Sequence, residues 1–197
     1  RGRVNPIIIG MLGGVASGKS LVAEMLGELG AHVLNADAIG HEVLRTDPEV
    51  RRELCELWGD GILDVDGQID RVRIGQRVFG DSADAASNRQ RLEKLLHPRI
   101  RQRVEARIDA IPKRSPTPVV VVDAPLLLEA GWREFCSLLV FVDTPMAIRN
   151  ERGTRRGWEP AELARREAAQ MPVDEKRRRA DVVIENLALD GNKEHND

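Results

Sequence analysis

Five short apolar runs recur along the chain, and helical patterns of hydrophobic and polar positions fill the stretches between them. The runs are nearly continuous rather than alternating, which is typical of strands buried on both faces of a parallel sheet. They cover residues 7–12, 32–35, 119–122, 137–142 and 182–184. The pattern therefore predicts an α/β fold built on a doubly wound, parallel five-stranded sheet.

The loop after the first predicted strand carries the phosphate-binding signature G-x-x-x-x-G-K-[ST]. It reads Gly-Gly-Val-Ala-Ser-Gly-Lys-Ser over residues 13–20, and an amphipathic helix pattern follows it. In that context the backbone N–H groups curl toward phosphate oxygens and the helix N-terminus adds partial positive charge. Lys19 is expected to bridge the outer phosphates and Ser20 to hold Mg²⁺. A glycine-rich turn without function is the weaker alternative, because motif and context agree.

Two helical stretches interrupt the α/β rhythm. Residues 48–111 contain no convincing buried strand and instead show arginine-rich amphipathic patterns over 88–96 and 99–111. A second helical and basic stretch covers residues 149–179. Insertions of this kind on a P-loop core are typical of small-molecule kinases, in which one insertion grips the acceptor and another closes as a lid. We expect one domain over residues 1–197, with a core (about 1–47, 117–148 and 180–197), an acceptor-binding insertion (about 48–116) and a lid (about 149–179).

Two aspartates end predicted strands, at the edge of a parallel sheet where catalytic groups gather. Asp37 follows the second strand, where its carboxylate would orient an acceptor hydroxyl and accept its proton. The alternative for Asp37 is an N-cap for a helix beginning at Ala38. Asp123 ends the third strand, where it is a candidate second ligand of Mg²⁺, and a strand-end cap is its alternative.

Basic residues cluster in the predicted lid. Arg149, Arg152, Arg155 and Arg156 lie close together, and Arg152 and Arg156 share one helix face. They are candidates to clamp ATP phosphates, with a solvated basic face as the alternative. For the run 176–179, Lys-Arg-Arg-Arg, the solvated face is the favoured interpretation. His97 precedes Pro98 between two helical patterns, and a helix boundary there explains it.

Composition narrows the functional classes. The net charge is −2 although 31% of residues are charged, which gives no general attraction to nucleic acid or anionic membranes. Tyrosine is absent and aromatic residues make up only 3%, so base-stacking platforms are not expected. No run approaches membrane-spanning length. The two cysteines have no metal-ligand spacing, which argues against zinc and favours a reducing cytoplasm.

Beyond the P-loop, further segments give the chain a resemblance to the dephospho-CoA kinase family along nearly its whole length. The P-loop alone indicates only a superfamily, whereas the later segments occur in the family's order and are much more specific. The matching segments are Leu12 to Leu21 around the P-loop, Asn35-Ala36-Asp37, Leu95-Leu96-His97-Pro98, Ala124-Pro125-Leu126-Leu127-Leu128-Glu129, Arg152 with Arg156, and Ala168-Ala169-Gln170-Met171-Pro172 through Lys176 and Ala180-Asp181 to Val183-Ile184-Glu185-Asn186.

The resemblance implies a P-loop kinase that transfers the γ-phosphoryl of ATP to the ribose 3′-hydroxyl of dephospho-CoA, the last step of coenzyme A synthesis, in the cytoplasm, with Mg²⁺. It implies ATP and dephospho-CoA as partners, no nucleic acid or membrane, and a monomer or small homo-oligomer. Asp37, Lys19 and Arg152 would be catalytic. ATP would contact Gly14, Val15, Ala16, Ser17, Gly18, Lys19, Ser20, Leu21, Arg152, Arg156 and Asn186, and dephospho-CoA would contact Asp37, His97, Pro98, Pro125 and Leu126.

The chain departs from the family pattern at three places. Asn35 replaces the first Asp of D-A-D, Leu21 replaces the Thr after the P-loop Ser, and Leu187-Ala188 stands where a glycine usually comes two residues after Asn186. Three alternatives stay open, the last of them because of Leu21 and the altered loop after Asn186. They are another P-loop small-molecule kinase such as a nucleoside monophosphate kinase, a regulatory or nucleic-acid-binding P-loop ATPase that is not a kinase, and a homologue that only binds nucleotide.

Overall fold

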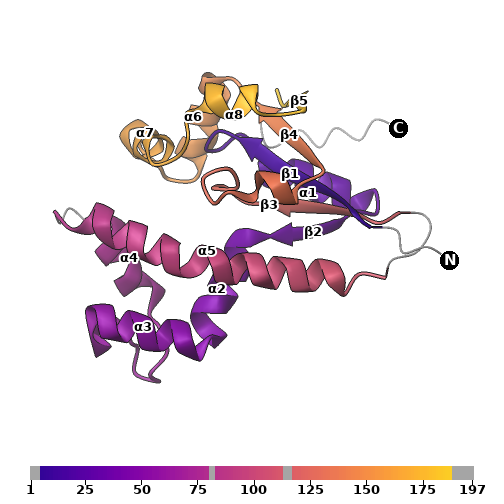
Figure 1. The fold of residues 1–197 in the computed structure, drawn as a ribbon. Helices are drawn as coiled ribbons and strands as arrows, with labels where there is room; N and C mark the ends of the chain where they lie inside the picture. Colours follow the sequence, from indigo (N-terminus) through magenta and orange to yellow (C-terminus); the bar gives the residue numbers. More distant parts are fainter. Residues whose placement is uncertain (1–4, 80–82, 113–116, 188–197) are drawn as a thin grey trace. The chain divides into compact units, whose positions relative to one another are not determined.

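The computed structural model describes residues 5–79, 83–112 and 117–187. Within these residues five strands form one parallel sheet in the order β2-β3-β1-β4-β5 (Figure 1). The strands are β1 (Ile7–Gly13), β2 (His32–Asn35), β3 (Val119–Asp123), β4 (Leu138–Asp143) and β5 (Val182–Glu185). The predicted α/β fold with a parallel five-stranded sheet is confirmed, and each strand lies where an apolar run predicts it.

The strand register brings polar residues at the ends of the strands to one edge of the sheet. Asn35 on β2 pairs with Asp123 on β3, which is itself opposite Met11 on the central strand β1. On the other side of β1, the last residues of β4 and β5 are paired, Asp143 with Glu185. Since all strands are parallel, their carboxyl ends share this edge, and the phosphate-loop sequence leaves β1 there.

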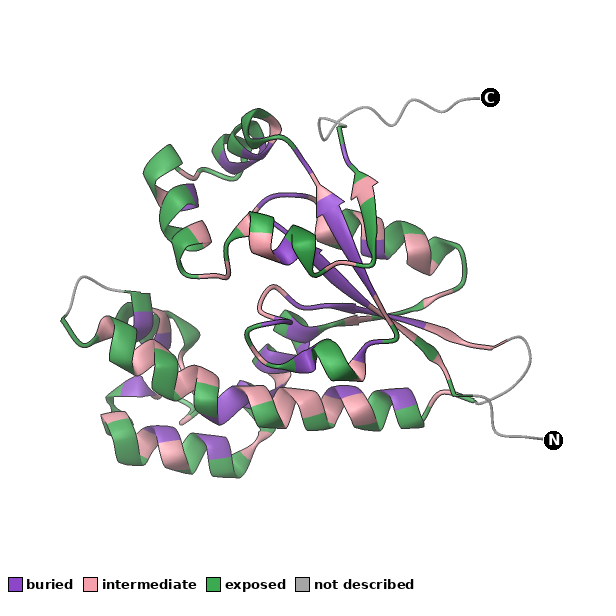
Figure 2. Cartoon of the chain, turned by 45° about the horizontal axis from the view of Figure 1, so that its top comes forward, coloured by how far each residue is buried: buried purple, intermediate pink, exposed green. Residues whose placement is uncertain are grey.

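The chain divides into two compact units, residues 1–35 with 111–197 and residues 36–110. The first unit holds the sheet. Its inner strands β1, β3 and β4 are largely buried, whereas the edge strands β2 and β5 are mostly exposed (Figure 2). Helix α1 packs on one face through Ala23, against a cluster that includes Met11, Val121 and Val140. The helices of this unit are α1 (Lys19–Glu28), α6 (Met146–Arg155), α7 (Pro160–Ala168) and α8 (Val173–Arg178), with a 3₁₀ turn, η2 (Trp132–Phe135).

Gly10 allows the chain to pack closely on the other face of the sheet. A β-carbon at Gly10 would lie 2.8 Å from Cys136 Sγ, 2.8 Å from Leu139 Cδ2 and 2.9 Å from Leu127 Cδ1. Leu127 belongs to the turn that follows β3, so the missing side chain lets this turn approach the central strand. The turn carries two predicted site residues, Pro125 and Leu126.

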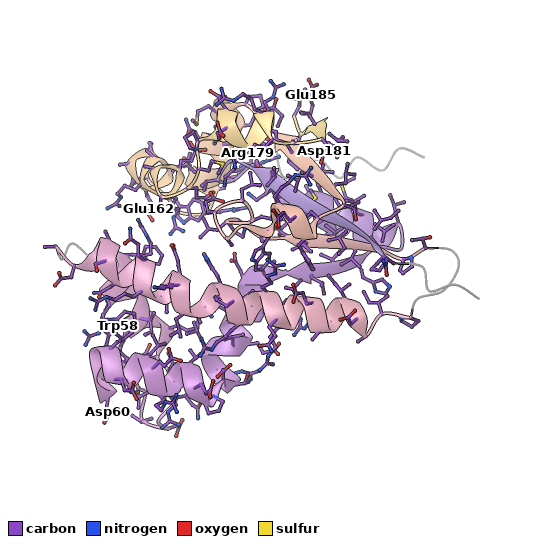
Figure 3. All side chains as sticks on the ribbon, in the orientation of Figure 1. Trp58, Asp60, Glu162, Arg179, Asp181 and Glu185 are labelled. Carbon is purple, nitrogen blue, oxygen red and sulfur yellow. The ribbon has the colours of Figure 1, made fainter. Side chains whose placement is uncertain are left out.

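The second unit is helical. It contains α2 (Ala36–Thr46), α3 (Pro48–Trp58), a 3₁₀ turn η1 (Asp60–Ile62), α4 (Arg71–Phe79) and α5 (Ala85–Asp109). Its core is formed by Ile39, Val43, Val50, Leu54, Ile62, Ile74 and Val104. Trp58, labelled in Figure 3, donates from Nε1 to Asn88 Oδ1 on α5 at 3.2 Å. The described part of this unit has no strand beyond an isolated bridge between Leu63 and Ile69, as the sequence predicts.

The expected helix boundary at His97 and Pro98 is wrong, because α5 runs without a break from Ala85 to Asp109. Proline lacks an N–H and its ring crowds the preceding turn, which usually ends or bends a helix. Here the Arg99 guanidinium donates to the carbonyl of Leu95 at 3.0 Å and is paired with Glu53 on α3 at 2.7 Å. These contacts, with the burial of Leu95 and Leu96, outweigh the local preference for a break.

Candidate functional site

The phosphate loop joins β1 to α1 through two residues with left-handed backbone. Gly18 has φ 86° and Ala16 has φ 59°, the latter uncommon for a residue with a side chain. Local strain of this kind gathers at ligand sites, where the surrounding structure holds it. No side chain caps the start of α1. The first N–H groups of the helix are therefore left for an anion.

Side chains from three later segments hold the carbonyl groups of the loop. The Ser17 carbonyl accepts from Thr144 Oγ1 at 2.8 Å and from Asn186 Nδ2 at 3.0 Å. Arg152 Nη1 donates to the Ala16 carbonyl at 3.3 Å, and Arg152 Nη2 donates to Asn186 Oδ1 at 3.3 Å. With these carbonyls fixed by buried partners, the loop is held in one conformation before any ligand binds.

A second arginine packs against the loop at Gly14. Arg149 Nε donates to the Thr144 carbonyl at 3.1 Å, and its Nη1 is ion-paired with Glu167 on α7. A β-carbon at Gly14 would lie 2.5 Å from this guanidinium and 2.9 Å from the Glu167 carboxylate. A side chain at this position would therefore have to displace the Arg149–Glu167 pair. The ion pair also joins α7 to α6.

Lys19 and Ser20 lie at the start of α1. Lys19 Nζ donates to the carbonyl groups of Gly13 and Gly14, at 3.4 and 3.2 Å. Ser20 Oγ donates to Asp123 Oδ2 at 2.6 Å, and Asp123 is buried. This pairing joins the phosphate loop to the end of β3.

A hydroxyl beside a carboxylate suits a divalent cation of the Mg²⁺ type. Such ions prefer oxygen ligands and are bound through one or two carboxylates together with substrate phosphates. The described residues contain no group of three or more His, Cys, Asp or Glu that could hold a metal. A Mg²⁺ site completed by phosphate does not need such a group, so Ser20 and Asp123 fit the ion.

The predicted ATP residues fall into two sets. The first set takes part in the hydrogen bonds in and around the phosphate loop and includes Gly14, Ala16, Ser17, Arg152 and Asn186. The second set, Leu21 and Arg156, takes no part in these hydrogen bonds. Leu21 stands on α1 with 41% of its surface exposed. Arg156 is exposed, with its guanidinium 5.6 Å from the centroid of the Trp158 ring, and its contact with ATP stays a prediction. Ala188, the last altered position, lies outside the described residues.

Asp37 lies in the first turn of α2, in the second unit. The helix begins at Ala36, so the expectation that Asp37 is the N-cap of a helix beginning at Ala38 is wrong. His41 lies one turn further on and its Nε2 is 2.7 Å from Arg71 Nη2. Burial and the Arg71 charge lower the pKa of His41, while the Asp37 carboxylate acts in the opposite direction. His97 and Pro98 also belong to this unit, on α5.

The expectation of a solvated basic face over residues 176–179 is wrong for its first residue. Lys176 is buried, with three oxygen acceptors around its Nζ. The other three residues are exposed but ion-paired, Arg177 with Asp143, and Arg178 and Arg179 with Glu175. Lysine at a helical position with an otherwise polar pattern gives no sign of burial, so only the fold reveals it.

Two contributors to the site were not singled out from sequence. Thr144 directly follows β4 and binds the loop through its hydroxyl, and Glu167 holds Arg149. The position of Thr144, just beyond a strand next to the P-loop strand, is the one signal that could have indicated it. Glu167 lies among alternating charges on a helix and carries no such signal.

The fold and the site together define a P-loop nucleotide-binding protein of the parallel α/β class. A strained phosphate loop between the central strand and a helix carries the G-x-x-x-x-G-K-[ST] pattern, and a strand-end carboxylate binds the Ser. A profile of the family described as dephospho-CoA kinase matches residues 7–190. The chain belongs to the dephospho-CoA kinase family.

Individual relatives agree with this membership. The chain is 38% identical over 182 residues to a dephospho-CoA kinase of Geobacillus kaustophilus, covering 91% of this chain and 88% of that protein. It is 41% identical over 181 residues to one of Geobacter sulfurreducens, covering 91% and 89%. The crystal structure of TT1252 from Thermus thermophilus is 34% identical, covers 93% of this chain and 90% of its own, and superposes with a TM-score of 0.76. The fold is shared by a Campylobacter jejuni dephospho-CoA kinase at 24% identity, with coverage of 91% and 87% and a TM-score of 0.59.

Proposed function

We propose that this protein transfers the γ-phosphoryl group of ATP to the ribose 3′-hydroxyl of dephospho-CoA, giving coenzyme A and ADP. The observation that carries the proposal is the phosphate loop with Ser20 bound to Asp123 at the end of β3. Such an arrangement supports phosphoryl transfer, and the relatives named dephospho-CoA kinase support the choice of acceptor. We place this reaction in the cytoplasm, in a monomer or small homo-oligomer that binds neither nucleic acid nor membrane. Among the described helices, none has the length and apolar content to span a membrane.

On the nucleotide side, the N–H groups of residues 14–20 and the start of α1 bind the phosphates of ATP. Lys19 exchanges its contacts with the loop carbonyls for phosphate oxygens, which carry more negative charge. Arg152 keeps the loop in shape through Ala16 and adds a buried positive charge beside it. These groups stabilise the charge that develops on the phosphoryl group during transfer.

Ser20 and Asp123 would hold Mg²⁺, Ser20 through its hydroxyl and Asp123 through its carboxylate. When bound, the ion neutralises phosphate charge and orients the outer phosphates. Asp123 is suited to this position because it is buried and fixed at a strand end. A carboxylate so held keeps its position when the nucleotide arrives.

On the acceptor side, Asp37 accepts the proton of the 3′-hydroxyl while the hydroxyl oxygen bonds to the γ-phosphorus and ADP leaves. Asp37 lies two residues after Asn35, the register partner of Asp123 on the neighbouring strand. This short separation along the chain supports the proposed role of Asp37. The second unit, with His97 and Pro98, and the turn with Pro125 and Leu126 would bind the remainder of dephospho-CoA.

A coupled assay of ADP release tests the proposal. The protein with Mg²⁺ and ATP is compared on dephospho-CoA, AMP, CMP, UMP and no acceptor. We expect turnover on dephospho-CoA alone. Asp37→Asn is expected to retain ATP binding and to lose about 100-fold or more in kcat, the contribution of a general base.

The outcomes separate the alternatives. Turnover on a nucleoside monophosphate would favour another small-molecule kinase, and ADP release without acceptor would favour an ATPase. ATP binding without any turnover would favour a homologue that only binds nucleotide. An Asp37→Asn variant as active as the wild type would remove Asp37 from proton transfer.

A further inference from the structure

Lys176 on α8 is a buried lysine that the proposed reaction does not use. Only 2% of its side chain is exposed. Its Nζ donates to the Pro125 carbonyl at 3.0 Å and to Gln170 Oε1 at 2.9 Å, and lies 3.1 Å from Glu129 Oε1. A lysine ammonium has three N–H donors, so these three oxygens use all of them. The Lys176 ammonium therefore has no remaining N–H donor for a phosphate oxygen.

The acceptors come from two separate segments. Pro125 and Glu129 belong to the turn after β3, whereas Gln170 lies between α7 and α8. Glu129 Oε1 also accepts from the backbone N–H of Met171 at 2.7 Å. The ammonium and the carboxylate together join this turn to the lid segment that ends in α8.

The turn held by Lys176 begins directly after Asp123, the carboxylate proposed to bind Mg²⁺. Asp123 is two residues before Pro125 and accepts the Ser20 hydroxyl. The intervening turn is closed by its own backbone bonds, from Leu127 N–H to the Ala124 carbonyl at 3.3 Å and from Ala130 N–H to the Leu126 carbonyl at 2.8 Å. The pairing of Asp123 with Met11 and Asn35 fixes its backbone from the strand side, and a fixed Pro125 carbonyl restrains the chain that leaves β3 directly after it.

We propose that Lys176 is a positioning residue for the Asp123 carboxylate, holding the turn after β3 and the lid segment as one piece so that Asp123 faces the phosphate loop. The role of Asp123 toward Mg²⁺ rests on the proposed function. A buried ion pair costs desolvation and is weak evidence for stability alone. Its contact with the carbonyl two residues after Asp123 gives it a use in orientation, as outer-shell partners have in metal sites.

The test compares Lys176→Met with Arg179→Met. Methionine has a similar length and no donors. Arg179, labelled in Figure 3 and directly following α8, is exposed, and among the described residues its ion pair is with the nearby Glu175 on α8. Calorimetry measures the affinity for ATP with EDTA and with saturating Mg²⁺, and the ADP-release assay measures the Mg²⁺ concentration for half-maximal rate. We expect Lys176→Met to lose about tenfold in the Mg²⁺-dependent gain in ATP affinity and to need more Mg²⁺ by a similar factor. Its Mg²⁺-free ATP affinity and all values for Arg179→Met should stay near those of the wild type.

A second variant covers the case in which Lys176→Met does not fold. Glu129→Gln keeps an oxygen for both Lys176 and Met171 but removes the charge, and a shift in the same direction is expected. If the folded variants melt at lower temperature yet keep the wild-type Mg²⁺ response, Lys176 is a structural brace only and the proposal is overturned. If the wild type itself binds ATP equally with and without Mg²⁺, the assigned role of Asp123 fails instead. Calorimetry needs no acceptor, so this distinction does not depend on dephospho-CoA turnover.

Discussion

Replacing Asn186 with alanine removes two hydrogen bonds from the support of the phosphate loop. The amide donates to the Ser17 carbonyl at 3.0 Å and accepts from Arg152 Nη2 at 3.3 Å. Asn186 is 8% exposed and Arg152 is 1% exposed, so water does not readily replace the lost partners. Arg152 would then have one acceptor fewer around a buried charge.

The size of the effect follows from these two bonds. A neutral amide–carbonyl bond contributes about 1 kcal/mol net, and a bond to a charged group about 1.5–3 kcal/mol. The Ser17 carbonyl keeps its bond from Thr144, so the lower end of the sum, about 2.5 kcal/mol, is the better guide. If the whole loss appears as poorer order of the loop, ATP affinity falls by about 60-fold, at 1.4 kcal/mol per factor of ten.

Calorimetry with ATP measures this affinity, and urea unfolding measures stability in parallel. We expect Asn186→Ala to bind ATP between about tenfold and 100-fold more weakly than the wild type while retaining a cooperative unfolding transition. Asn150→Ala, an exposed asparagine on α6, is the matched control and should bind as the wild type does. An Asn186→Ala protein that binds ATP within a factor of two of the wild type would refute the view that this amide holds the loop in its binding conformation.

Three further predictions follow from other parts of the structure. Gly10→Ala should lower the free energy of unfolding, measured in urea, by about 1–3 kcal/mol, because three side-chain atoms would lie under 3.0 Å from the new methyl group. The control Gly75→Ala has open space around the new methyl group and should not destabilise the protein. Equal free energies of unfolding for the two variants would contradict the close packing at Gly10 of β1. Burial raises the pKa of Cys136 to about 11, so at pH 8 this thiol should react with a disulfide reagent only after unfolding, and rapid labelling of the native protein, located by mass spectrometry, would count against its burial. Burial and Arg71 lower the pKa of His41 in the folded state. Its contribution to stability is therefore present above the unfolded pKa and is lost as the pH falls from that value through the lower folded pKa. Urea titrations at pH 8 and pH 5 should therefore show a smaller loss of stability on acidification for His41→Gln than for the wild type, and identical pH dependences would exclude His41 as a contributor.

Local pattern was sufficient for the sheet and for the centre of the site. A continuous β-branched run such as residues 119–122 indicates a buried strand. The spacing of the glycines, Lys19 and Ser20 indicates a phosphate loop. The position of Asp123 next to the phosphate loop was predictable, because the carboxyl ends of parallel strands lie at one edge of the sheet. Helix α5 was not, since Pro98 favours a break and the contacts of Arg99 with Leu95 and Glu53 that accompany the continuous helix are tertiary.

Long-range partners explain the rest. Arg152 and Arg156 look alike in sequence, yet the first is buried at Ala16 and the second lies over Trp158. Lys176 belongs to a run of four cations, and only its acceptors on distant segments separate it from its neighbours. Their sequence separations from these partners, such as 51 residues between Lys176 and Pro125, leave no trace in local periodicity. The division into core, acceptor-binding insertion and lid stays a prediction.

The most direct test of the proposed function is the position of the transferred phosphate. The protein is incubated with Mg²⁺, ATP and dephospho-CoA, and the product is analysed by phosphorus NMR with coupling to the ribose protons. The account predicts one new phosphomonoester signal coupled to the ribose 3′ proton, formed in step with ADP and absent for Lys19→Met. A phosphate on another hydroxyl, or ADP formed without any new phosphomonoester, would contradict it.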